Sequence, residues 1–594
     1  MSTDSSSALK AWTRALELTA PIGRGPRRIL PIVMDELADR YDAAPALVSK
    51  EGNFSYRELS EASNRIARWA LAQGVGAGDV VCLLMPNCPQ YLATWIGLTR
   101  IGAVVSLLNT NLSGAVLAHS INIVAPRLII VSADLAGGLE AVRGQLPGNL
   151  LWRAWGPGDH QLESLEQRIA AFPAAPLLDS ECRTPSLEDR ALLIYTSGTT
   201  GLPKAANVSH YRLMQWSHWF AGLIDVETKD RMYNCLPMYH SVGGVVATCA
   251  PLIGGGSVVL RKRFSAREFW SDVVEEGCTL FQYIGELCRY LVNTPPQPLE
   301  TRHRLRLCCG NGLRPDVWKQ FKTRFRIPKI LEYYASTEGN FSLYNCEGRE
   351  GAIGRIPPFL RHRVSVALVR FDVTSGAPLR DDTGRCVRCE TGEAGEAIGQ
   401  ILEADGRTAS RFEGYADAEA SAKKILHDVF VPGDAWFRTG DLMRKDAQGF
   451  FYFVDRIGDT FRWKGENVSS AEVAGELLSC TNVQEAVVYG VSVPGSDGRA
   501  GMAALVTGAD FDLGIFRQEL GARLPEYARP LFVRILTAIE ATGTFKPKTQ
   551  ELAVQGYDPS VVSDGLYFDD RNRQAYVPLD TALFAKLQAS AVRL

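Results

Sequence analysis

The sequence has little net charge and no regular arrangement of cysteines. It carries 64 basic and 66 acidic residues among 594, which leaves a formal net charge of -2. That balance gives no electrostatic reason to expect nucleic acid as a partner. The 13 cysteines include one CxxC pair, Cys386 and Cys389, without the second pair or nearby histidines that a zinc site needs. We therefore expect reduced thiols in a cytoplasmic protein and no zinc centre.

An uninterrupted apolar run of membrane-spanning length is also lacking. Residues 242–260 carry no charge, but Pro251 and five glycines fall within them. Those residues would interrupt a lipid-exposed helix. The segment predicts instead a buried helix, a glycine turn and a buried strand.

The N-terminal segment has no continuous apolar region, so a cleaved secretory signal is not expected. Leu9, Trp12 and Leu16 would share one face of a helix that also carries Lys10 and Arg14. Such a helix suits either peripheral contact with the inner face of a membrane or packing against its own domain. Both alternatives stay open here.

Short apolar runs alternate with helical patterns along most of the chain. The runs are β-like, whereas the segments 56–73 and 266–276 have helical periodicity; the runs are 80–84, 128–131, 192–195, 257–260 and 305–308. Such alternation predicts an α/β protein with largely parallel sheets. No internal repeat and no low-complexity tract is evident.

The pattern of predicted secondary structure changes at two points along the chain. From Arg363 to Ile401, short strands alternate with turn signals, which predicts a smaller β-rich subdomain. After Asp455, the pattern predicts a compact α+β unit with helices near 470–477 and 513–524 and strands near 486–491 and 502–506. We therefore expect a large N-terminal domain of layered α/β and β-rich subdomains over 1–455, and a small, mobile C-terminal domain over 456–594.

A loop rich in glycine and hydroxyl groups is the strongest chemical signal. It reads Tyr195-Thr196-Ser197-Gly198-Thr199-Thr200-Gly201-Leu202-Pro203-Lys204, after an apolar strand and before a helix expected near Tyr211. Backbone N–H donors, hydroxyls and one lysine can together wrap a polyphosphate. The spacing is not that of the common Walker loop, where lysine follows directly after the second glycine.

This decapeptide resembles the phosphate loop of the adenylate-forming enzymes, the superfamily of acyl-CoA synthetases, peptide synthetase adenylation domains and firefly luciferase. Other motifs of that superfamily follow in order: Gly310-Asn311-Gly312-Leu313-Arg314-Pro315, Tyr333-Tyr334-Ala335-Ser336-Thr337-Glu338-Gly339, Trp436-Phe437-Arg438-Thr439-Gly440-Asp441 and Asp455-Arg456-Ile457-Gly458-Asp459.

The resemblance implies a role for each motif. Gly310, Asn311 and Gly312 would lie beside adenine, and Tyr334 would stack on it. Thr337 would meet the α-phosphate, while Asp441 and Arg456 would bind the ribose. Lys204 would contact the β- and γ-phosphates, and Mg²⁺ would be held by Thr196 and Glu338, since oxygen ligands suit a hard cation.

The family's catalytic lysine is expected at Lys546, although Lys548 is close enough to leave the choice open. The pivot of domain rotation would be Gly458 or Asp459. Lys464 and Gly465 would lie near the pantetheine of coenzyme A.

The segment 455–468 is similar to the fatty acid transport protein branch, also called very-long-chain acyl-CoA synthetases, as are 109–112, 283–290 and 541–546. This similarity implies a ligase that joins a fatty acid to coenzyme A through an acyl-adenylate, with ATP and Mg²⁺ and with release of AMP and pyrophosphate. We assign His240, Trp216, Tyr283 and Ile284 to the acyl pocket, although an aromatic stripe on a helix is also typical of a core. Alternatives are a ligase for bile-acid or sterol side chains, an adenylation domain for a carrier protein, and a membrane-associated uptake factor.

Overall fold

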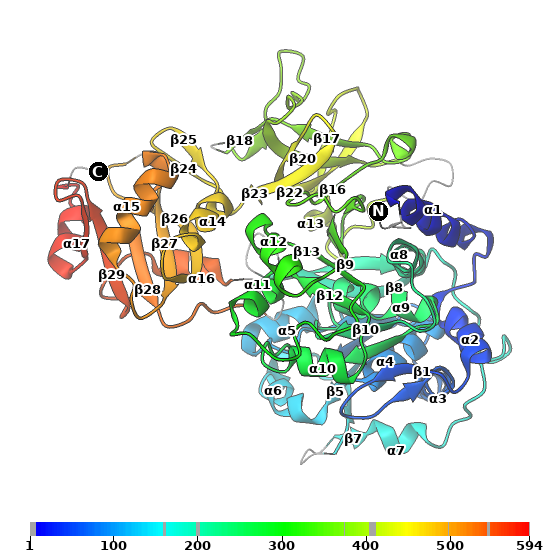
Figure 1. Cartoon of the computed structure of the whole chain (residues 1–594). Coiled ribbons are helices and arrows are strands. Elements are labelled where there is room, and N and C mark those ends of the chain that lie inside the picture. The colour runs from blue at the N-terminus through cyan, green and yellow to red at the C-terminus, as the bar shows by residue number, and fades with distance from the viewer. Residues whose placement is uncertain are drawn as a thin grey trace. The chain divides into compact units, whose positions relative to one another are not determined.

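The computed structural model describes residues 7–157, 162–197, 202–373, 375–402, 411–496, 498–542 and 547–592. Contacts between residues divide the chain into two compact units, and Figure 1 labels their helices and strands. Unit 1 comprises 1–356 and 403–425, and unit 2 comprises 357–402 and 426–594. The expected boundary at 455/456 falls within unit 2 and stays a prediction.

The first sheet of unit 1 has seven strands, with β9 antiparallel to β8 and the other pairs parallel. Its strands, in spatial order, are β7 (Glu163–Ser164), β6 (Leu151–Trp155), β5 (Leu128–Ser132), β3 (Val80–Leu84), β4 (Val104–Leu107), β8 (Arg190–Ser197) and β9 (Pro203–Ser209). Every residue of β4 and β5 is buried, as is typical of strands covered on both faces. The strands predicted at 80–84, 128–131 and 192–195 are confirmed.

The second sheet of unit 1 is parallel in its centre and antiparallel at its ends. Its strands within this unit are, in order, β16 (Gly354–Arg355), β15 (Ser342–Asn345), β14 (Ile330–Ala335), β13 (Leu307–Asn311), β12 (Leu280–Ile284), β10 (Arg231–Asn234), β11 (Ser257–Leu260), β1 (Pro45–Val48) and β2 (Phe54–Ser55). The strand predicted at 305–308 begins two residues later, at Leu307.

Helices occur between most of these strands along the chain. They are α1 (Ala8–Thr19), α2 (Leu30–Tyr41), α3 (Tyr56–Ala72), α4 (Pro89–Arg100), α5 (Gly114–Asn122), α6 (Ala136–Glu140), α7 (Leu165–Ile169), α8 (His210–Leu223), α9 (Cys249–Ile253), α10 (Phe269–Glu275), α11 (Gly285–Asn293), α12 (Pro315–Arg324) and α13 (Ala418–Ala422). The helix predicted at 56–73 is α3, and a capping box of Ser55 and Glu58 fixes its start.

The uncharged segment 242–260 folds as predicted. A π-helical turn (Val242–Val246) and α9 precede a glycine turn and the buried strand β11. Across the described ranges, no helix combines the length and the apolar character that a membrane crossing requires.

Helix α1 packs against α8 within unit 1. The Trp12 side chain is buried in edge-to-face contact with Trp219 and Tyr344, and Arg14 forms an ion pair with Asp225 at 3.0 Å. Packing on its own domain therefore accounts for most of the predicted apolar face. Leu9 remains 58% exposed, and membrane contact through this segment stays a prediction.

Unit 2 begins with the predicted β-rich segment. Its strands are β17 (Val366–Val369), β18 (Phe371–Asp372), β19 (Ala377–Pro378), β20 (Ala394–Gln400), β21 (Ile425–His427, whose first residue belongs to unit 1), β22 (Ala435–Lys445) and β23 (Phe450–Arg456). Strands β17, β20, β22 and β23 form one antiparallel series.

The remainder of unit 2 is the predicted α+β fold. The strands β24 (Phe461–Trp463) and β25 (Glu466–Val468) form a hairpin. A five-stranded sheet contains β26 (Val483–Ser492), β27 (Arg499–Thr507), β28 (Phe532–Leu536), β29 (Gly565–Asp570) and β30 (Ala575–Pro578). The helices are α14 (Ser470–Leu478), α15 (Leu513–Arg523), α16 (Thr549–Gln555) and α17 (Thr581–Gln588). Its apolar core includes Phe532, Phe568 and Leu477.

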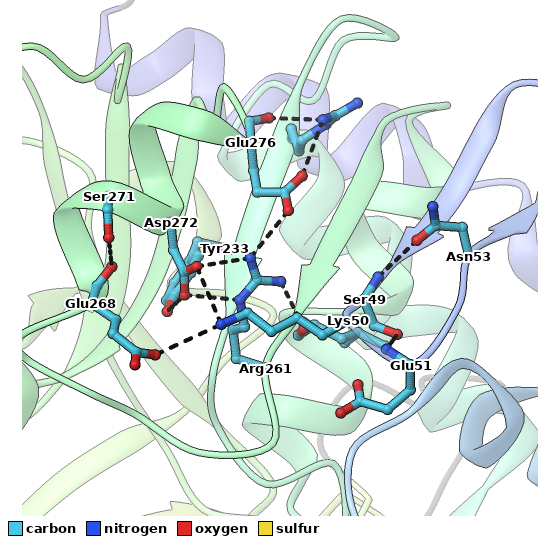
Figure 2. Close-up of polar contacts among 12 residues, drawn as sticks. Ser49, Lys50, Glu51, Asn53, Tyr233, Arg261, Glu268, Ser271, Asp272 and Glu276 are labelled. Carbon is cyan, nitrogen blue, oxygen red and sulfur yellow. Dashed lines mark hydrogen bonds and ion pairs between the residues drawn. The ribbon is translucent and has the colours of Figure 1, made fainter.

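A buried ion-pair network joins α10 to the end of β11 (Figure 2). The guanidinium of Arg261 donates to both carboxylate oxygens of Asp272, at 2.8 and 3.0 Å, and to Glu276 at 3.1 Å. The side chains of Arg261 and Asp272 are only 8% and 10% exposed. Lys50 contacts Asp272 from outside, at 4.0 Å, and is itself 61% exposed.

This network predicts that substitutions of Arg261 and Lys50 lower the free energy of unfolding by different amounts. Arg261→Met leaves a buried carboxylate without its partner, so the free energy of unfolding should fall by about 3–5 kcal/mol. Lys50→Met removes only an exposed charge and should cost at most about 1 kcal/mol. Urea unfolding followed by tryptophan fluorescence measures both, and equal losses in the two variants would contradict a buried network.

Candidate functional site

The described residues of the phosphate loop belong to two antiparallel strands. Thr196 pairs with Lys204 and Ser197 pairs with Pro203, across the two strands β8 and β9. Gly198, Thr199, Thr200 and Gly201 lie outside the described residues. The helix expected near Tyr211 begins at His210, but the strand β9 comes between loop and helix. Sequence reasoning missed β9, because Lys204, Ala205 and Ala206 lack a clear strand pattern.

The buried side chain of Tyr195 fixes the end of strand β8 in this hairpin. Its hydroxyl bonds to the Ser106 hydroxyl at 2.7 Å and donates to the Ser120 carbonyl. Burial raises the pKa of this phenol well above its ordinary value, so it stays a neutral donor. These contacts hold the end of β8 against β4 and α5.

The segment 411–416 runs beside β9 and brings Tyr415 to the hairpin. The Asn207 amide donates to the Gly414 carbonyl at 3.0 Å, and the Ala416 amide donates to the Ala205 carbonyl at 2.8 Å. The Tyr415 ring lies 5.7 Å from the ammonium of Lys204, a cation–π distance. Its hydroxyl donates to Glu338 Oε1 at 2.8 Å. Tyr415 thus links Lys204 to the Thr337-Glu338 motif.

Arg212 joins the same three segments from the first turn of α8. It is 7% exposed and donates to the carbonyl oxygens of Thr337 and Arg411, at 2.9 and 2.8 Å. The Glu413 carboxylate lies 3.5 Å from its guanidinium and accepts from the Ser209 amide and hydroxyl, at 2.8 and 2.6 Å. Arg212 and Tyr415 therefore connect the segments that carry the predicted residues Thr196, Lys204, Thr337 and Glu338. Sequence reasoning identified neither of these two.

The predicted adenine segment follows directly from β13. A side chain at Gly310 would place its Cβ 2.3 Å from the Tyr283 carbonyl oxygen, and Gly312 has a φ of +78°. Both positions thus require glycine. The buried Oδ1 of Asn311 has no hydrogen-bond partner among the residues that the structure covers. An exocyclic amino group such as that of adenine is a donor that would satisfy it.

Glu332, buried on β14, holds this segment in place. It accepts a hydrogen bond from the Leu313 amide at 3.0 Å and another from the Tyr283 hydroxyl. Burial raises the pKa of its carboxyl to about 8. Tyr283 is itself fully buried, so core packing accounts for it, and its place in an acyl pocket stays a prediction. An acidic residue inside an apolar strand pattern was the signal that could have identified Glu332.

The other predicted acyl residues lie in the same unit as Thr337. Ser241, next to His240, bonds to the Thr337 hydroxyl at 3.2 Å. Burial lowers the pKa of His240 to about 4, so its imidazole is neutral at physiological pH. Trp216 lies 5.7 Å from the Arg212 guanidinium, and Ile284 ends β12 half-buried. Tyr334 lies on β14 with its ring 6.0 Å from that of Phe341.

In unit 2, the predicted ribose-binding residues face each other on neighbouring strands. Asp441 on β22 is paired in register with Arg456 on β23, and their side chains approach to 3.8 Å. The buried carboxylate of Asp455 accepts from the Ser470 amide at 2.6 Å and so fixes the start of α14. Asp441 and Arg456 are therefore adjacent, as a shared ribose ligand requires.

The expected pivot lies in a turn after β23. The Asp459 amide donates to the Arg456 carbonyl at 3.0 Å, and a Cβ at Gly458 would meet no atom within 4 Å. Nothing in this turn therefore requires glycine, and the choice between Gly458 and Asp459 stays open.

Lys464 and Gly465 form the turn between β24 and β25, with positive φ values of 52° and 86°. Lys464 also lines a cavity of about 310 Å³ together with Trp463, Ser496 and Ser590. Lys546 lies outside the described residues. The ammonium of Lys548 donates a hydrogen bond to the Glu540 carboxylate at 3.0 Å and lies 3.4 Å from Glu551. The hydrogen bond to Glu540 raises the pKa of this ammonium.

Comparison with known proteins gives consistent matches over the chain. A family model described as AMP-binding enzyme matches residues 34–395, and one described as AMP-binding enzyme C-terminal domain matches 472–546. Long-chain fatty acid transport protein 1 of Mus musculus is 40% identical over 570 residues, covering 94% of this chain and 87% of that protein. Long-chain fatty acid transport protein 6 of Mus musculus is 40% identical over 577 residues, covering 95% of this chain and 92% of that protein. A crystal structure of an anthranilate CoA ligase with anthranoyl-AMP has a TM-score of 0.75 at 21% identity, covering 88% of this chain and 96% of that one, which shows a shared fold.

The buried carboxyl of Glu332 predicts a pH-dependent stability. Its pKa is about 8 in the folded protein against an ordinary 4.5, so its contribution to folding is complete below about pH 4.5 and is lost as pH rises toward 8. Glu332→Gln, which keeps the acceptor for Leu313, should abolish this loss. Urea unfolding between about pH 5 and pH 8 should therefore show the wild type weakening relative to the variant.

The matched control is Glu166→Gln, at an exposed position of α7, and the stability of this variant should follow that of the wild type at every pH. Parallel pH profiles for the wild type and Glu332→Gln would contradict the raised pKa.

Proposed function

Because the chain belongs to the AMP-binding enzymes and, within them, to the long-chain fatty acid transport proteins, we propose that it is an AMP-forming fatty acid:CoA ligase. The observation that carries the proposal is the convergence of Lys204, Thr337 and Glu338 around Tyr415 and Arg212, with Thr196 paired to Lys204 across the hairpin. Such a group of hydroxyls, one ammonium and one carboxylate suits a nucleotide triphosphate with its cation.

The residues present also fit the two parts of ATP beyond its phosphates. The unpartnered Oδ1 of Asn311 offers an acceptor for the adenine amino group. Asp441 offers a carboxylate to the ribose hydroxyls, with Arg456 beside it. Tyr334 offers an aromatic face for the purine.

The first step needs fixed positive charge, because a carboxylate and a triphosphate repel each other. In the proposed mechanism, Lys204 holds the β- and γ-phosphates, Thr337 hydrogen-bonds to the α-phosphate, and Lys546 bridges that phosphate and the fatty acid carboxylate. The carboxylate oxygen attacks the α-phosphorus and the bond to pyrophosphate breaks, which yields an acyl-adenylate. Mg²⁺, held by Thr196 and Glu338, would neutralise phosphate charge when bound.

The second step transfers the acyl group to coenzyme A. The coenzyme A thiolate attacks the acyl carbon and AMP leaves, so no protein nucleophile is required. Lys464 and Gly465 are proposed to contact the pantetheine after a rotation about Gly458 or Asp459. A turn without a bulky side chain at its centre can absorb such a rotation.

A fatty acid is the proposed acid. Its support is the similarity of the chain to long-chain fatty acid transport proteins. The neutral His240, the indole of Trp216 and the half-buried Ile284 are proposed to line the acyl pocket, since an uncharged lining suits an alkyl chain.

Fatty-acid-dependent exchange of pyrophosphate into ATP tests the proposed reaction. We expect long-chain acids to support exchange at least about tenfold faster than acetate, because each added methylene that is buried contributes about 0.8 kcal/mol. Amino acids serve as the control class. Exchange that is fastest with acetate or with an amino acid would contradict a long-chain acyl site.

The two candidate lysines predict different half-reactions. Lys546→Ala should reduce adenylate formation by at least about 100-fold, because it removes a cation from the developing charge at the α-phosphate. Thioester formation from supplied acyl-adenylate should stay within a few-fold of the wild type. Lys548→Ala is the matched control, since Lys548 is bonded to Glu540. If Lys548→Ala lost adenylation and Lys546→Ala kept it, the assignment would be reversed.

A further inference from the structure

The Ser241 hydroxyl joins the segment that carries His240 to the segment that carries Thr337. Ser241 and Thr337 lie 96 residues apart along the chain, and their hydroxyl oxygens form a hydrogen bond of 3.2 Å. Both side chains are half-buried. The first segment is proposed to line the acyl pocket, and the second to meet the α-phosphate of ATP. This hydroxyl pair therefore links the two halves of the proposed adenylation site, and the mechanism above gives Ser241 no role.

A buried amide and a buried hydroxyl shape the turn that follows Ser241. The π-helical turn 242–246 begins directly after this residue. The Asn234 side chain donates to the Gly243 carbonyl at 2.9 Å, and the Thr248 hydroxyl donates to the same carbonyl at 2.7 Å. Both side chains are fully buried, where a polar group is costly unless it is hydrogen-bonded. These contacts therefore fix the turn and, with it, the position of Ser241.

Thr337 is held in place separately. Its carbonyl accepts a hydrogen bond from the buried guanidinium of Arg212 at 2.9 Å, and the Gly339 amide donates to the Ser336 carbonyl at 3.1 Å. Because each backbone is fixed by its own contacts, the two hydroxyls face each other without help from a ligand.

The two hydroxyls can bond in either direction, and a phosphate selects one of them. Each hydroxyl has one proton and two lone pairs. A phosphate oxygen only accepts hydrogen bonds, so in the proposed mechanism Thr337 directs its proton to the α-phosphate. The bond between the two hydroxyls is then possible only if Ser241 donates to Thr337. In the opposite direction, Thr337 would present lone pairs to the phosphate oxygen, and the two would repel.

We propose that Ser241 is a positioning residue for adenylation: its hydroxyl donates to the Thr337 hydroxyl and thereby directs the Thr337 proton toward the α-phosphate. Two hydrogen bonds in series polarise each other, so the donation to the phosphate strengthens as negative charge develops there. Ser241 itself contacts neither ATP nor the acid in this role. The inference rests on the proposed function, because it takes reaction at the α-phosphate of ATP as given.

Ser241→Ala tests this role, because it removes only the hydroxyl. We expect kcat for acid-dependent pyrophosphate exchange to fall about tenfold, the size of one lost hydrogen bond. The KM for ATP should stay within about twofold of the wild type, because the bond acts mainly on the charge that develops in the transition state. Urea unfolding of the same preparation shows whether the variant is folded.

A double-mutant cycle tests whether Ser241 acts through Thr337. Thr337→Val keeps the shape of the side chain, removes its hydroxyl and should lower kcat at least about tenfold, since the α-phosphate loses a donor. Adding Ser241→Ala to Thr337→Val should then lower kcat by less than about twofold more, because the hydroxyl that Ser241 orients is already gone. Two losses that simply multiply would overturn the proposal.

Ser63→Ala is the matched control, since the buried Ser63 hydroxyl on α3 donates to the Leu59 carbonyl of its own helix at 2.8 Å. Its exchange rate should equal that of the wild type, and in the Thr337→Val background it should change nothing further. An unchanged kcat in Ser241→Ala would overturn the proposal, and so would a higher KM for ATP at unchanged kcat. A wild type without ATP-dependent exchange for any acid would overturn the proposed function itself, and this inference with it.

Discussion

The buried guanidinium of Arg212 is the contact on which the geometry of the site depends. From the first turn of α8 it donates to the Thr337 and Arg411 carbonyls and pairs with Glu413. Those partners lie more than a hundred residues away along the chain. A buried charge is costly unless it is fully partnered, so the three segments are held together strongly. Thr337 and Glu338 are thereby held beside the strand that follows the phosphate loop.

Buried charged or acidic side chains also hold backbone segments in place at the adenine segment and in unit 2. Glu332, buried on β14, holds the turn after β13, and Asp455 on β23 holds the start of α14. In each case one buried carboxyl accepts backbone amides at the end of a secondary-structure element. The groups proposed to meet ATP lie next to these anchors rather than at them, so the anchors set the position and leave the binding groups available.

The sequence predicted the fold class because hydrophobic runs, glycines and turn residues are local signals. The strands at 80–84 and 128–131, and the helix–turn–strand at 242–260, follow from such patterns. The motif residues Lys204, Thr337 and Glu338 were found through resemblance, and the structure brings them together. Arg212, Glu413 and Tyr415 were missed because a charged or phenolic side chain reads as a surface residue until the topology shows its partners. Strand β9 was missed because three successive residues of its seven, Lys204 to Ala206, show no alternation.

The proposed reaction converts a fatty acid and coenzyme A to an acyl-CoA, with ATP cleaved to AMP and pyrophosphate. Its most direct test incubates the protein with ATP, Mg²⁺, coenzyme A and an equimolar mixture of fatty, aromatic, sterol-derived and short acids. Mass spectrometry then identifies the coenzyme A thioesters. We expect long-chain acyl-CoA to dominate, with AMP formed in equal amount. Dominance of a sterol-derived, aromatic or short acyl thioester, or thioester formation without AMP, would contradict it.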